Sequence, residues 1–246
     1  MPAAVEHLAR QRRLRRSWPH QAPCHRGTVT VSVVIPTFNR VAPLVRCIRA
    51  LPTDVEIVVV DDGSSDGTAQ IAGRVSHPNM CIVSKENGGP ASSRNLGIRH
   101  AHGDVVAFTD DDCVPAPGWP HRLAERLRSE PTAVGGVGGT VLPLKDGWIS
   151  RYSTFHHILE APPSRSYLVT ANCAYRREVL NLVGGFDETI KHPGGEDPEL
   201  SFRVRKAGYT LAHEASAVVH HDYRESLTDF AKTFYRYGKG CARVVA

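Results

Sequence analysis

Short β-branched runs alternate with helical patterns from about residue 29 onward, and this alternation constrains the fold more than any other feature. The apolar runs are bounded by turn-forming residues, as is typical of buried strands, and they cover 29–35, 55–60, 80–84 and 105–109. Patterns typical of helices fill the gaps at 41–51, 69–75 and 91–100. Strands that alternate with helices form βαβ units. The sequence therefore predicts an α/β fold with a mixed, mainly parallel sheet flanked by helices.

The second half of the chain is less regular but continues the same domain. Strands are expected at 133–142, 167–175 and 215–219, and a helix at 198–207. Neither a helical nor a strand period is evident in 148–166. An amphipathic helix is predicted at 226–237, and we expect it to pack on the domain. No internal repeat or low-complexity linker interrupts the pattern, so one domain is predicted for 28–225, followed by a C-terminal helix and tail at 226–246.

The excess positive charge lies at the start of the chain. Of the 30 Lys and Arg residues, six lie within 1–27, where one of the 25 acidic residues is found. This leaves 24 basic and 24 acidic side chains in the remainder, so nucleic acid is not an expected partner. Residues 1–27 are predicted to form a basic, disordered tail.

Cysteine spacing and hydropathy indicate the compartment. The six cysteines form no CxxC pair, so neither a zinc site nor a disulfide framework is expected, and a reducing cytoplasm fits best. The sequence has no secretory signal pattern and no apolar run of the ~20 residues needed to span a bilayer. The basic tail and the C-terminal helix are two segments through which the protein could touch the inner face of the membrane.

Polar side chains follow three of the predicted strands directly. They belong to the runs Thr37 to Asn39, Asp61 with Asp62, and Asp110 to Asp112. Ligands of open parallel sheets bind at the carboxyl ends of the strands, where these residues should meet. The sequence therefore predicts a ligand site at this edge of the sheet.

The acidic run Asp110, Asp111 and Asp112 is a candidate metal site. Adjacent carboxylates repel one another where water is excluded, unless a cation neutralises them. Oxygen ligands suit Mg²⁺ or Mn²⁺, which also bind substrate phosphates. An exposed acidic turn or a helix N-cap would have the same residues, so the run alone does not decide between these interpretations. The second acidic pair, Asp61 and Asp62, favours a functional site.

Three further segments carry candidate residues. Residues 89–95 open a helix whose backbone N–H groups, with Arg94, would suit a diphosphate. Glu196 and Asp197 precede a helix, where a carboxylate could act as a general base or could only stabilise the helix N-terminus. His220 and His221 follow a predicted strand, and either imidazole could complete a metal site.

In this order, the segments resemble the family 2 glycosyltransferases, which have the Rossmann-like GT-A fold. The resemblance runs through VSVVIPTFNR, EIVVVDDGSSDGT, ENGGPASSRNLGI, GDVVAFTDDD and GGFDE…GGEDPELSFRVRKAGY, roughly residues 30 to 221. It implies a nucleotide-binding half at about 28–115 and an acceptor half at about 116–225. The QxxRW-type motif of processive polysaccharide synthases does not follow residue 221.

On the donor side, the resemblance implies a nucleotide pocket and a diphosphate site. The residues implied there are Pro36, Thr37, Asn39, Arg40, Asp61, Asp62, Arg94, Asp110 and Asp111. Asp61 and Asp62 would meet the base and the ribose, and which acid contacts which group stays open. A UDP-sugar is the favoured donor, with guanosine and thymidine nucleotides as alternatives.

On the reaction side, the resemblance implies a metal site and a catalytic base. The metal ligands implied are Asp110, Asp112 and one of the pair His220 and His221. Asp197 matches the base, with Glu196 as the alternative. The implied reaction is an inverting sugar transfer to a hydroxyl of a glycan, a lipid-linked molecule or a small molecule. Mn²⁺ or Mg²⁺ would stabilise the departing nucleoside diphosphate.

Two other functions remain as alternatives. A nucleotidyltransferase of similar fold would attack the α-phosphate, but its glycine- and lysine-rich loop is missing after 29–35, where PTFNR stands. A sugar-nucleotide-binding protein without catalysis is disfavoured because Asp112 and Asp197 are both present.

Overall fold

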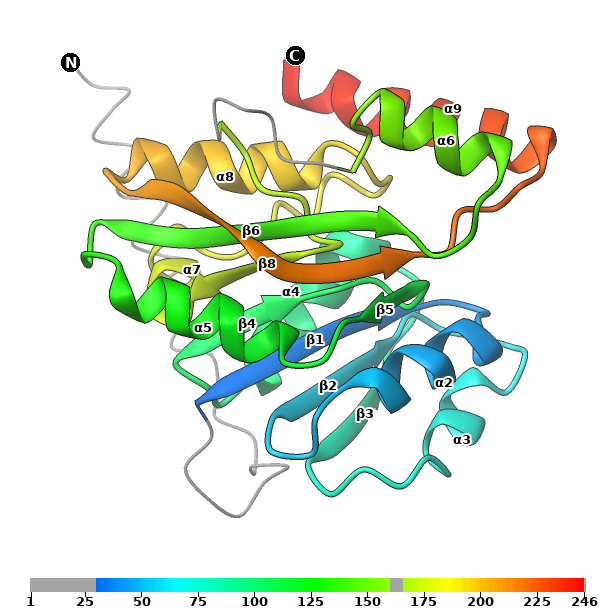
Figure 1. The fold of residues 1–246 in the computed structure, drawn as a ribbon, viewed down its shortest axis with the longest axis horizontal. Helices are drawn as coiled ribbons and strands as arrows, with labels where there is room; N and C mark the ends of the chain where they lie inside the picture. Colours follow the sequence, from blue (N-terminus) through cyan, green and yellow to red (C-terminus); the bar gives the residue numbers. More distant parts are fainter. Residues whose placement is uncertain (1–29, 160–165, 246) are drawn as a thin grey trace.

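A mixed sheet runs through the middle of the structure (Figure 1). The computed structural model describes residues 30–159 and 166–245. Across the sheet the strand order is β3-β2-β1-β4-β7-β6-β8-β5. The strands are β1 (Val31–Thr37), β2 (Glu56–Asp61), β3 (Met80–Ser84), β4 (Val105–Phe108), β5 (Cys113–Pro115), β6 (Val134–Pro143), β7 (Cys173–Arg176) and β8 (Thr210–His221).

The strand directions confirm the predicted mixed, mainly parallel sheet. The strands β3, β2, β1 and β4 run parallel to one another. The strand β7 is antiparallel to both β4 and β6, β5 is antiparallel to β8, and β6 and β8 are parallel. The carboxyl ends of β1, β2 and β4 therefore meet at one edge, as the polar strand ends predicted.

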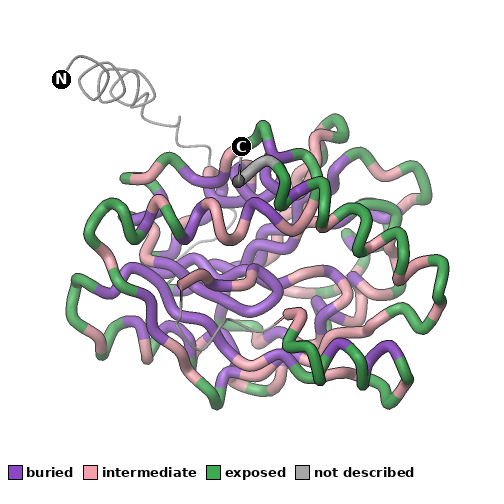
Figure 2. Tube along the Cα trace, turned by 90° about the horizontal axis from the view of Figure 1, so that it is seen from above, coloured by how far each residue is buried: buried purple, intermediate pink, exposed green. Residues whose placement is uncertain are grey.

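Helices cover both faces of the sheet. They are α2 (Val41–Ala50), α3 (Thr68–Ala72), α4 (Pro90–His100), α5 (Trp119–Ser129), α6 (Trp148–Phe155), α7 (Arg177–Val183), α8 (Glu196–Lys206) and α9 (Leu227–Val245). Because alternate strand residues point to opposite faces, Val33 packs with α2 and α5 while Val34 packs with α4, α7 and α8. Figure 2 shows buried strands at the centre and exposed outer faces on the helices.

The strand β1 extends beyond its predicted end at residue 35, through Pro36 to Thr37. The carbonyl of Val34 accepts a hydrogen bond from the N–H of Thr109, and the register of β1 with β4 ends there. The nitrogen of Pro36 faces the same side, beyond the last paired residue of β4. A proline fits at this position because no ladder hydrogen bond is required from it.

Other predictions of secondary structure were also incomplete or wrong. Helix α5 was not predicted, although its buried residues Trp119, Leu123 and Leu127 recur at helical spacing. The segment 148–166 was not expected to be regular, yet it begins with α6. The strand predicted at 167–175 is confined to β7, because the backbone before it bonds to α8 side chains instead.

The C-terminal helix is longer than predicted and packs on the domain beside α6 and α8 (Figure 1). Within 30–159 and 166–245, no helix is both long and apolar enough to cross a membrane. The basic tail predicted at 1–27 lies outside the described residues.

Helix α4 packs so closely on β1 that a methyl group at Gly97 would lie 2.2 Å from Cγ1 of Val34. We predict that Gly97→Ala lowers the free energy of unfolding by about 1–3 kcal/mol, because the buried valine must move. Equilibrium denaturant unfolding measures this change. Gly238→Ala in α9 is the matched control, since an added methyl there meets nothing within 4 Å. Equal stability of the two variants would contradict this packing.

Candidate active site

The loops after β1 and β2 are locked together by Asn39. Its backbone φ is +53°, a left-handed conformation that asparagine tolerates better than most residues. The N–H of Asn39 donates to Oγ of Ser64 at 2.8 Å, and its Oδ1 accepts from the N–H of Ser65 at 2.8 Å. Two of the strand-end segments singled out in the sequence therefore form one unit.

Asp62 fixes the glycine-containing loop that precedes α4. Its carboxylate accepts from Nζ of Lys85 at 2.6 Å and from the N–H groups of Gly88 at 3.0 Å and Gly89 at 2.9 Å. Asp61 is also buried, and its Oδ1 accepts from the N–H of Ser64 at 3.1 Å. Both oxygens of Asp62 are thus engaged by the protein.

Arg40 neutralises part of the acidic run after β4. Its Nη1 lies 2.9 Å from Oδ1 of Asp111 and also bonds to Asp112. Asp111 is buried and accepts from Oγ1 of Thr37 at 2.7 Å. Burial and the charge of Asp112 raise the pKa of Asp111 to about 7. Asp111 therefore faces the protein and holds Arg40 and Thr37 in place.

Asp112 and His221 meet across the β5–β8 pair. Oδ1 of Asp112 lies 3.3 Å from Nε2 of His221. Burial opposes ionisation of both groups, but their attraction, with Arg40 beside Asp112, lowers the pKa of Asp112 and raises that of His221. Neighbouring strand residues point to opposite faces, so His220 faces away from Asp112. Of the two histidines, His221 has the geometry for a shared site with Asp112.

The donor atoms at this position fit a divalent cation. Nδ1 of His221 is buried and has no hydrogen-bond partner within the described residues. Donor atoms of Asp112, Cys113 and His221 lie within 4.8 Å of one another. Burial raises the pKa of the Cys113 thiol, which keeps it protonated and a poor ligand. The carboxylate and the imidazole are the useful ligands for such a cation.

Arg94 connects the acidic run with the start of α8. Its guanidinium donates to Oδ1 of Asp110 at 2.9 Å and to Oε1 of Glu196 at 2.9 Å. It is buried and lies over the ring of Phe186, with 5.7 Å from Cζ to the ring centroid. The other oxygen of Glu196 accepts from the N–H groups of 194 and 195 at 2.8 and 3.1 Å. Both oxygens of Glu196 are therefore occupied.

Asp197 differs from Glu196 in having an unengaged oxygen. Its Oδ2 accepts from the N–H and the hydroxyl of Thr170, at 3.0 and 3.1 Å. Its Oδ1 is buried and has no hydrogen-bond partner in the part of the chain that the structure describes. Burial and the charge of Glu196, opposed by Arg94, raise the pKa of Asp197 to about 7. This carboxylate can accept a proton near neutral pH.

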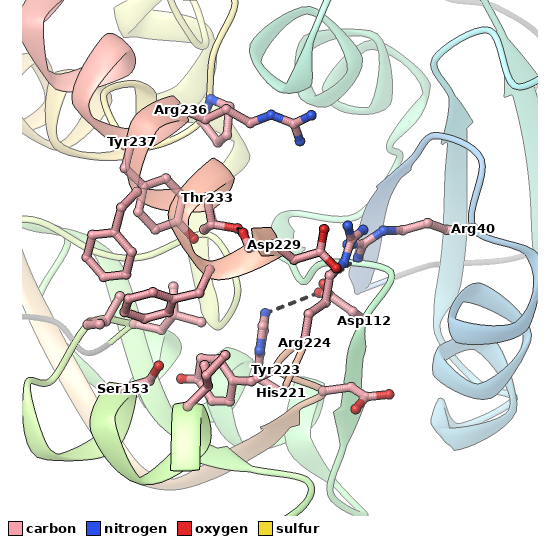
Figure 3. A pocket seen from close by; sticks show the side chains of 17 residues that line it. Arg40, Asp112, Ser153, His221, Tyr223, Arg224, Asp229, Thr233, Arg236 and Tyr237 are labelled. Carbon is pink, nitrogen blue, oxygen red and sulfur yellow. Dashed lines mark hydrogen bonds and ion pairs between the residues drawn. The ribbon is translucent and has the colours of Figure 1, made fainter. Parts of the chain in front are cut away.

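A cavity of about 190 Å³ opens beside Asp112 and His221 (Figure 3). Arg40, Asp112 and His221 line one side, and side chains of α9, Tyr237 among them, line the other. A second, more open hollow of about 610 Å³ shares Arg40 and Asp112 with it. Asp112 therefore borders both spaces.

The structure connects most of the residues predicted from the sequence. Pro36 is part of β1, Asn39, Asp61 and Asp62 are in the neighbouring loop network, and Asp197 follows Glu196 directly. One chain of hydrogen bonds and ion pairs joins Thr37, Arg40, Asp111, Asp112 and His221, and a second joins Asp110, Arg94 and Glu196.

Two contributors to the site were missed in the sequence. Thr170, which holds Asp197, lies in a segment predicted to be strand and carries no motif of its own. Tyr237 lies in the amphipathic helix predicted at 226–237, which was given no part in the site. Phe230, Phe234 and Tyr237 recur at helical spacing. This aromatic face was the feature of the sequence that indicated packing of the helix against the rest of the domain.

Comparison with known proteins gives consistent matches. The sequence model described as glycosyl transferase family 2 matches residues 32–184. The chain is 34% identical over 231 residues to the pre-mycofactocin glycosyltransferase of Mycobacterium tuberculosis, covering 88% of this chain and 47% of that protein. It is 31% identical over 228 residues to the glycosyltransferase AglE of Haloferax volcanii, covering 87% and 73%. The chain thus spans about half the length of the first relative.

Solved structures share the fold. The mannosyltransferase PcManGT from Pyrobaculum calidifontis, in complex with GDP-Man and Mn²⁺, has a TM-score of 0.65 at 24% identity, covering 97% of this chain and 71% of that chain. Glucosyl-3-phosphoglycerate synthase from Mycobacterium tuberculosis has a TM-score of 0.62 at 21% identity, covering 87% and 80%. At these identities the likeness concerns the fold.

Proposed function

This chain belongs to glycosyl transferase family 2 and has the GT-A fold, and we propose that it transfers a sugar from a nucleoside-diphosphate sugar to an acceptor hydroxyl with inversion. The observation that carries the proposal is the state of Asp197. It is half-buried near Arg94 and Glu196, with one oxygen fixed by Thr170 and the other buried and unengaged within the described residues. A fixed carboxylate with a pKa near neutrality is suited to general-base catalysis.

In the proposed reaction, the acceptor oxygen attacks the anomeric carbon as the bond from that carbon to the phosphate oxygen breaks. Oδ1 of Asp197 takes the acceptor proton, and the electrons of the broken bond leave with the nucleoside diphosphate. Glu196 is a weaker candidate for the base, because Arg94 and two backbone N–H groups already occupy its oxygens.

Asp61 and Asp62 have different proposed roles on the donor side. The carboxylate of Asp62 accepts three hydrogen bonds from Lys85 and the 88–89 backbone, so we assign it to fixing that loop. Asp61 we assign to the base or ribose. Pro36, Thr37, Asn39 and Arg40 would complete the nucleotide pocket around it.

Asp112 and His221 are the proposed metal ligands, with Asp110 close to the diphosphate beside Arg94. A divalent cation bound there would neutralise charge on the leaving diphosphate. Solved proteins of the same fold hold Mn²⁺ with GDP-Man or with UDP. We propose Mn²⁺ or Mg²⁺ for this chain.

The donor and acceptor are proposed by class. One protein of similar fold holds GDP-Man and another UDP-GlcNAc. A UDP-sugar is our first choice of donor, and the acceptor is a glycan, a lipid-linked molecule or a small molecule. One related protein, 28% identical over 203 residues, is a glucosyl-dolichyl phosphate glucuronosyltransferase.

A peripheral contact with anionic lipid is also proposed, through the outer face of α9. Leu227 and Tyr235 expose large apolar surfaces there. Lys232 and Lys239 follow at helical spacing, with Nζ of Lys239 4.7 Å from the ring centroid of Tyr235. An exposed apolar stripe bordered by basic residues is typical of helices that lie on a membrane surface.

For the catalytic base, we predict that Asp197→Asn lowers kcat by about 10²- to 10⁴-fold with little change in the KM for the donor. The substitution keeps the shape of the side chain but replaces the carboxylate, which accepts a proton, by an amide, which does not. Release of nucleoside diphosphate measures the rate, with UDP-, GDP- and dTDP-sugars screened in Mn²⁺ or Mg²⁺. Because Asp197 must be ionised, kcat of the parent should rise with pH and level off above about 7.

The matched control for that experiment is Asp104→Asn, the same change at an exposed carboxylate at the opposite edge of the sheet. Full activity of Asp197→Asn together with loss of activity in Glu196→Gln would transfer the role of base to Glu196. Release of pyrophosphate in place of nucleoside diphosphate would indicate nucleotidyl transfer.

For the metal site, His221→Ala is expected to weaken binding of Mn²⁺ alone by at least about tenfold, whereas His220→Ala leaves it unchanged. The reason is that the imidazole of His221 meets Asp112, while His220 faces away. Titration calorimetry with Mn²⁺ and no nucleotide measures both affinities. Equal affinities of the two variants would rule out His221 as the ligand.

For the lipid contact, co-sedimentation with vesicles that contain phosphatidylglycerol should fall when Lys232 and Lys239 are both changed to Glu. The matched control changes two exposed arginines to Glu, namely Arg49 in α2 and Arg74 just after α3. Binding that is unaffected by the α9 changes, or lost equally in the control, would contradict a contact through α9.

A further inference from the structure

Helix α9 approaches the loop before Asp197 at a distance that only glycine permits. A methyl group at Gly240 would lie 2.5 Å from the carbonyl oxygen of Pro193 and 2.9 Å from both the nitrogen of Gly195 and the carbonyl oxygen of His192. These are backbone atoms, which cannot rotate aside as the end of a long side chain can. The helix and the loop are therefore in direct backbone contact.

The loop is shaped for this contact from its own side. Gly194 has a φ of +105°, which favours glycine, and a methyl group on it would lie 2.9 Å from Cα of Tyr237. The thiol of Cys241 donates to the carbonyl of Gly194 at 3.0 Å. Contacts from two consecutive turns of α9 thus fall on one short segment.

The same loop is held on its inner side by the active-site network. The N–H groups of Gly194 and Gly195 both donate to Oε2 of Glu196. Oε1 of Glu196 pairs with Arg94, which in turn pairs with Asp110. A displacement of this loop would therefore change the position of Glu196 and of the next residue, Asp197.

The position of α9 is itself fixed on α6. Phe230 packs against Trp148 and Tyr152 of α6, with ring centroids 5.9 and 5.3 Å apart. Glu225, just before α9, accepts from the N–H groups of Ile149 and Ser150 at the start of α6. Helix α9 is thus anchored on α6 at its beginning, and farther along it contacts the loop that precedes Glu196 and Asp197.

We propose that α9 is a positioning element for catalysis, and that its contacts with residues 192–195 hold this loop so that Asp197 stays in place to accept the acceptor proton. Gly240, Gly194 and Cys241 act through Asp197 and are positioning residues. Tyr237 also lines the adjoining cavity, across from Asp112 (Figure 3). The inference rests on the proposed function for its catalytic readout.

The test compares two alanine substitutions in the same helix. Gly240→Ala must push the loop away, whereas Gly238→Ala adds a methyl that meets nothing within 4 Å. We expect Gly240→Ala to lower kcat by roughly 10- to 100-fold with a much smaller change in the donor KM, since the added methyl meets the backbone of residues 192–195 and not the residues assigned to the nucleotide. Gly238→Ala should retain the parental kcat. If α9 only packs on the domain, Gly240→Ala would lower the free energy of unfolding without lowering kcat selectively relative to KM.

Hydrogen exchange supplies a readout that does not need turnover. The amides of residues 194–197 should exchange faster in Gly240→Ala and at the parental rate in Gly238→Ala. Unchanged exchange at these amides, or equal kcat in the two variants, overturns the inference. Absence of turnover by the parent with every donor contradicts the proposed function instead, and the exchange comparison still decides the positioning role.

A smaller change keeps the test decisive if Gly240→Ala fails to fold. Cys241→Ala removes the thiol that bonds to the Gly194 carbonyl and adds no volume. We expect it to lower kcat a fewfold, and Cys241→Ser, which keeps a donor, to restore the parental value. Parental kcat and parental exchange in Cys241→Ala would count against the contact.

Discussion

The guanidinium of Arg94 is the interaction on which the site depends. It is buried and pairs at once with Asp110, after β4, and with Glu196, at the start of α8. A carboxylate as buried as Glu196 would be costly without a partner, and loss of one member of a buried pair is strongly destabilising. Arg94 thereby fixes the distance between Asp110 and the start of α8. The first is proposed to lie near the donor phosphates, and the second carries the proposed base.

Neighbouring acids in this site have different proton affinities because their partners differ. Asp112, between Arg40 and His221, is held ionised, whereas Asp111 next to it is buried against Thr37 and has a pKa raised to about 7. Asp197 has a similarly raised pKa although it follows the paired Glu196 directly. Position in the sequence therefore says little about which acid binds a cation and which accepts a proton. The partners contributed by distant elements decide it.

The parts of the fold that sequence predicts well are those set by local pattern. The parallel strands β1 to β4 and helices α2 and α4 lie within a few residues of their predicted positions, because each is a local apolar run with its own turn signals. The acidic strand ends also meet where the parallel topology requires. Helix α6 could not be predicted this way, since its N-terminal amides are capped by Glu225, more than 70 residues away.

The finer assignments at the site needed the three-dimensional structure for the same reason. The choice between His220 and His221 depends on which face of β8 lies toward Asp112, and therefore on the pairing of β8 with β5. The choice between Glu196 and Asp197 depends on Thr170 and Arg94, neither of which is near them in the sequence. Helix α5 is a different case, because its helical spacing was present in the sequence.

The central claim is that a single carboxylate, Asp197, accepts the acceptor proton in one displacement at the anomeric carbon. The most direct measurement is the anomeric configuration of the product, read by nuclear magnetic resonance from the coupling constant of the transferred sugar. The account predicts a configuration opposite to that of the donor. A product that retains the donor configuration would contradict it.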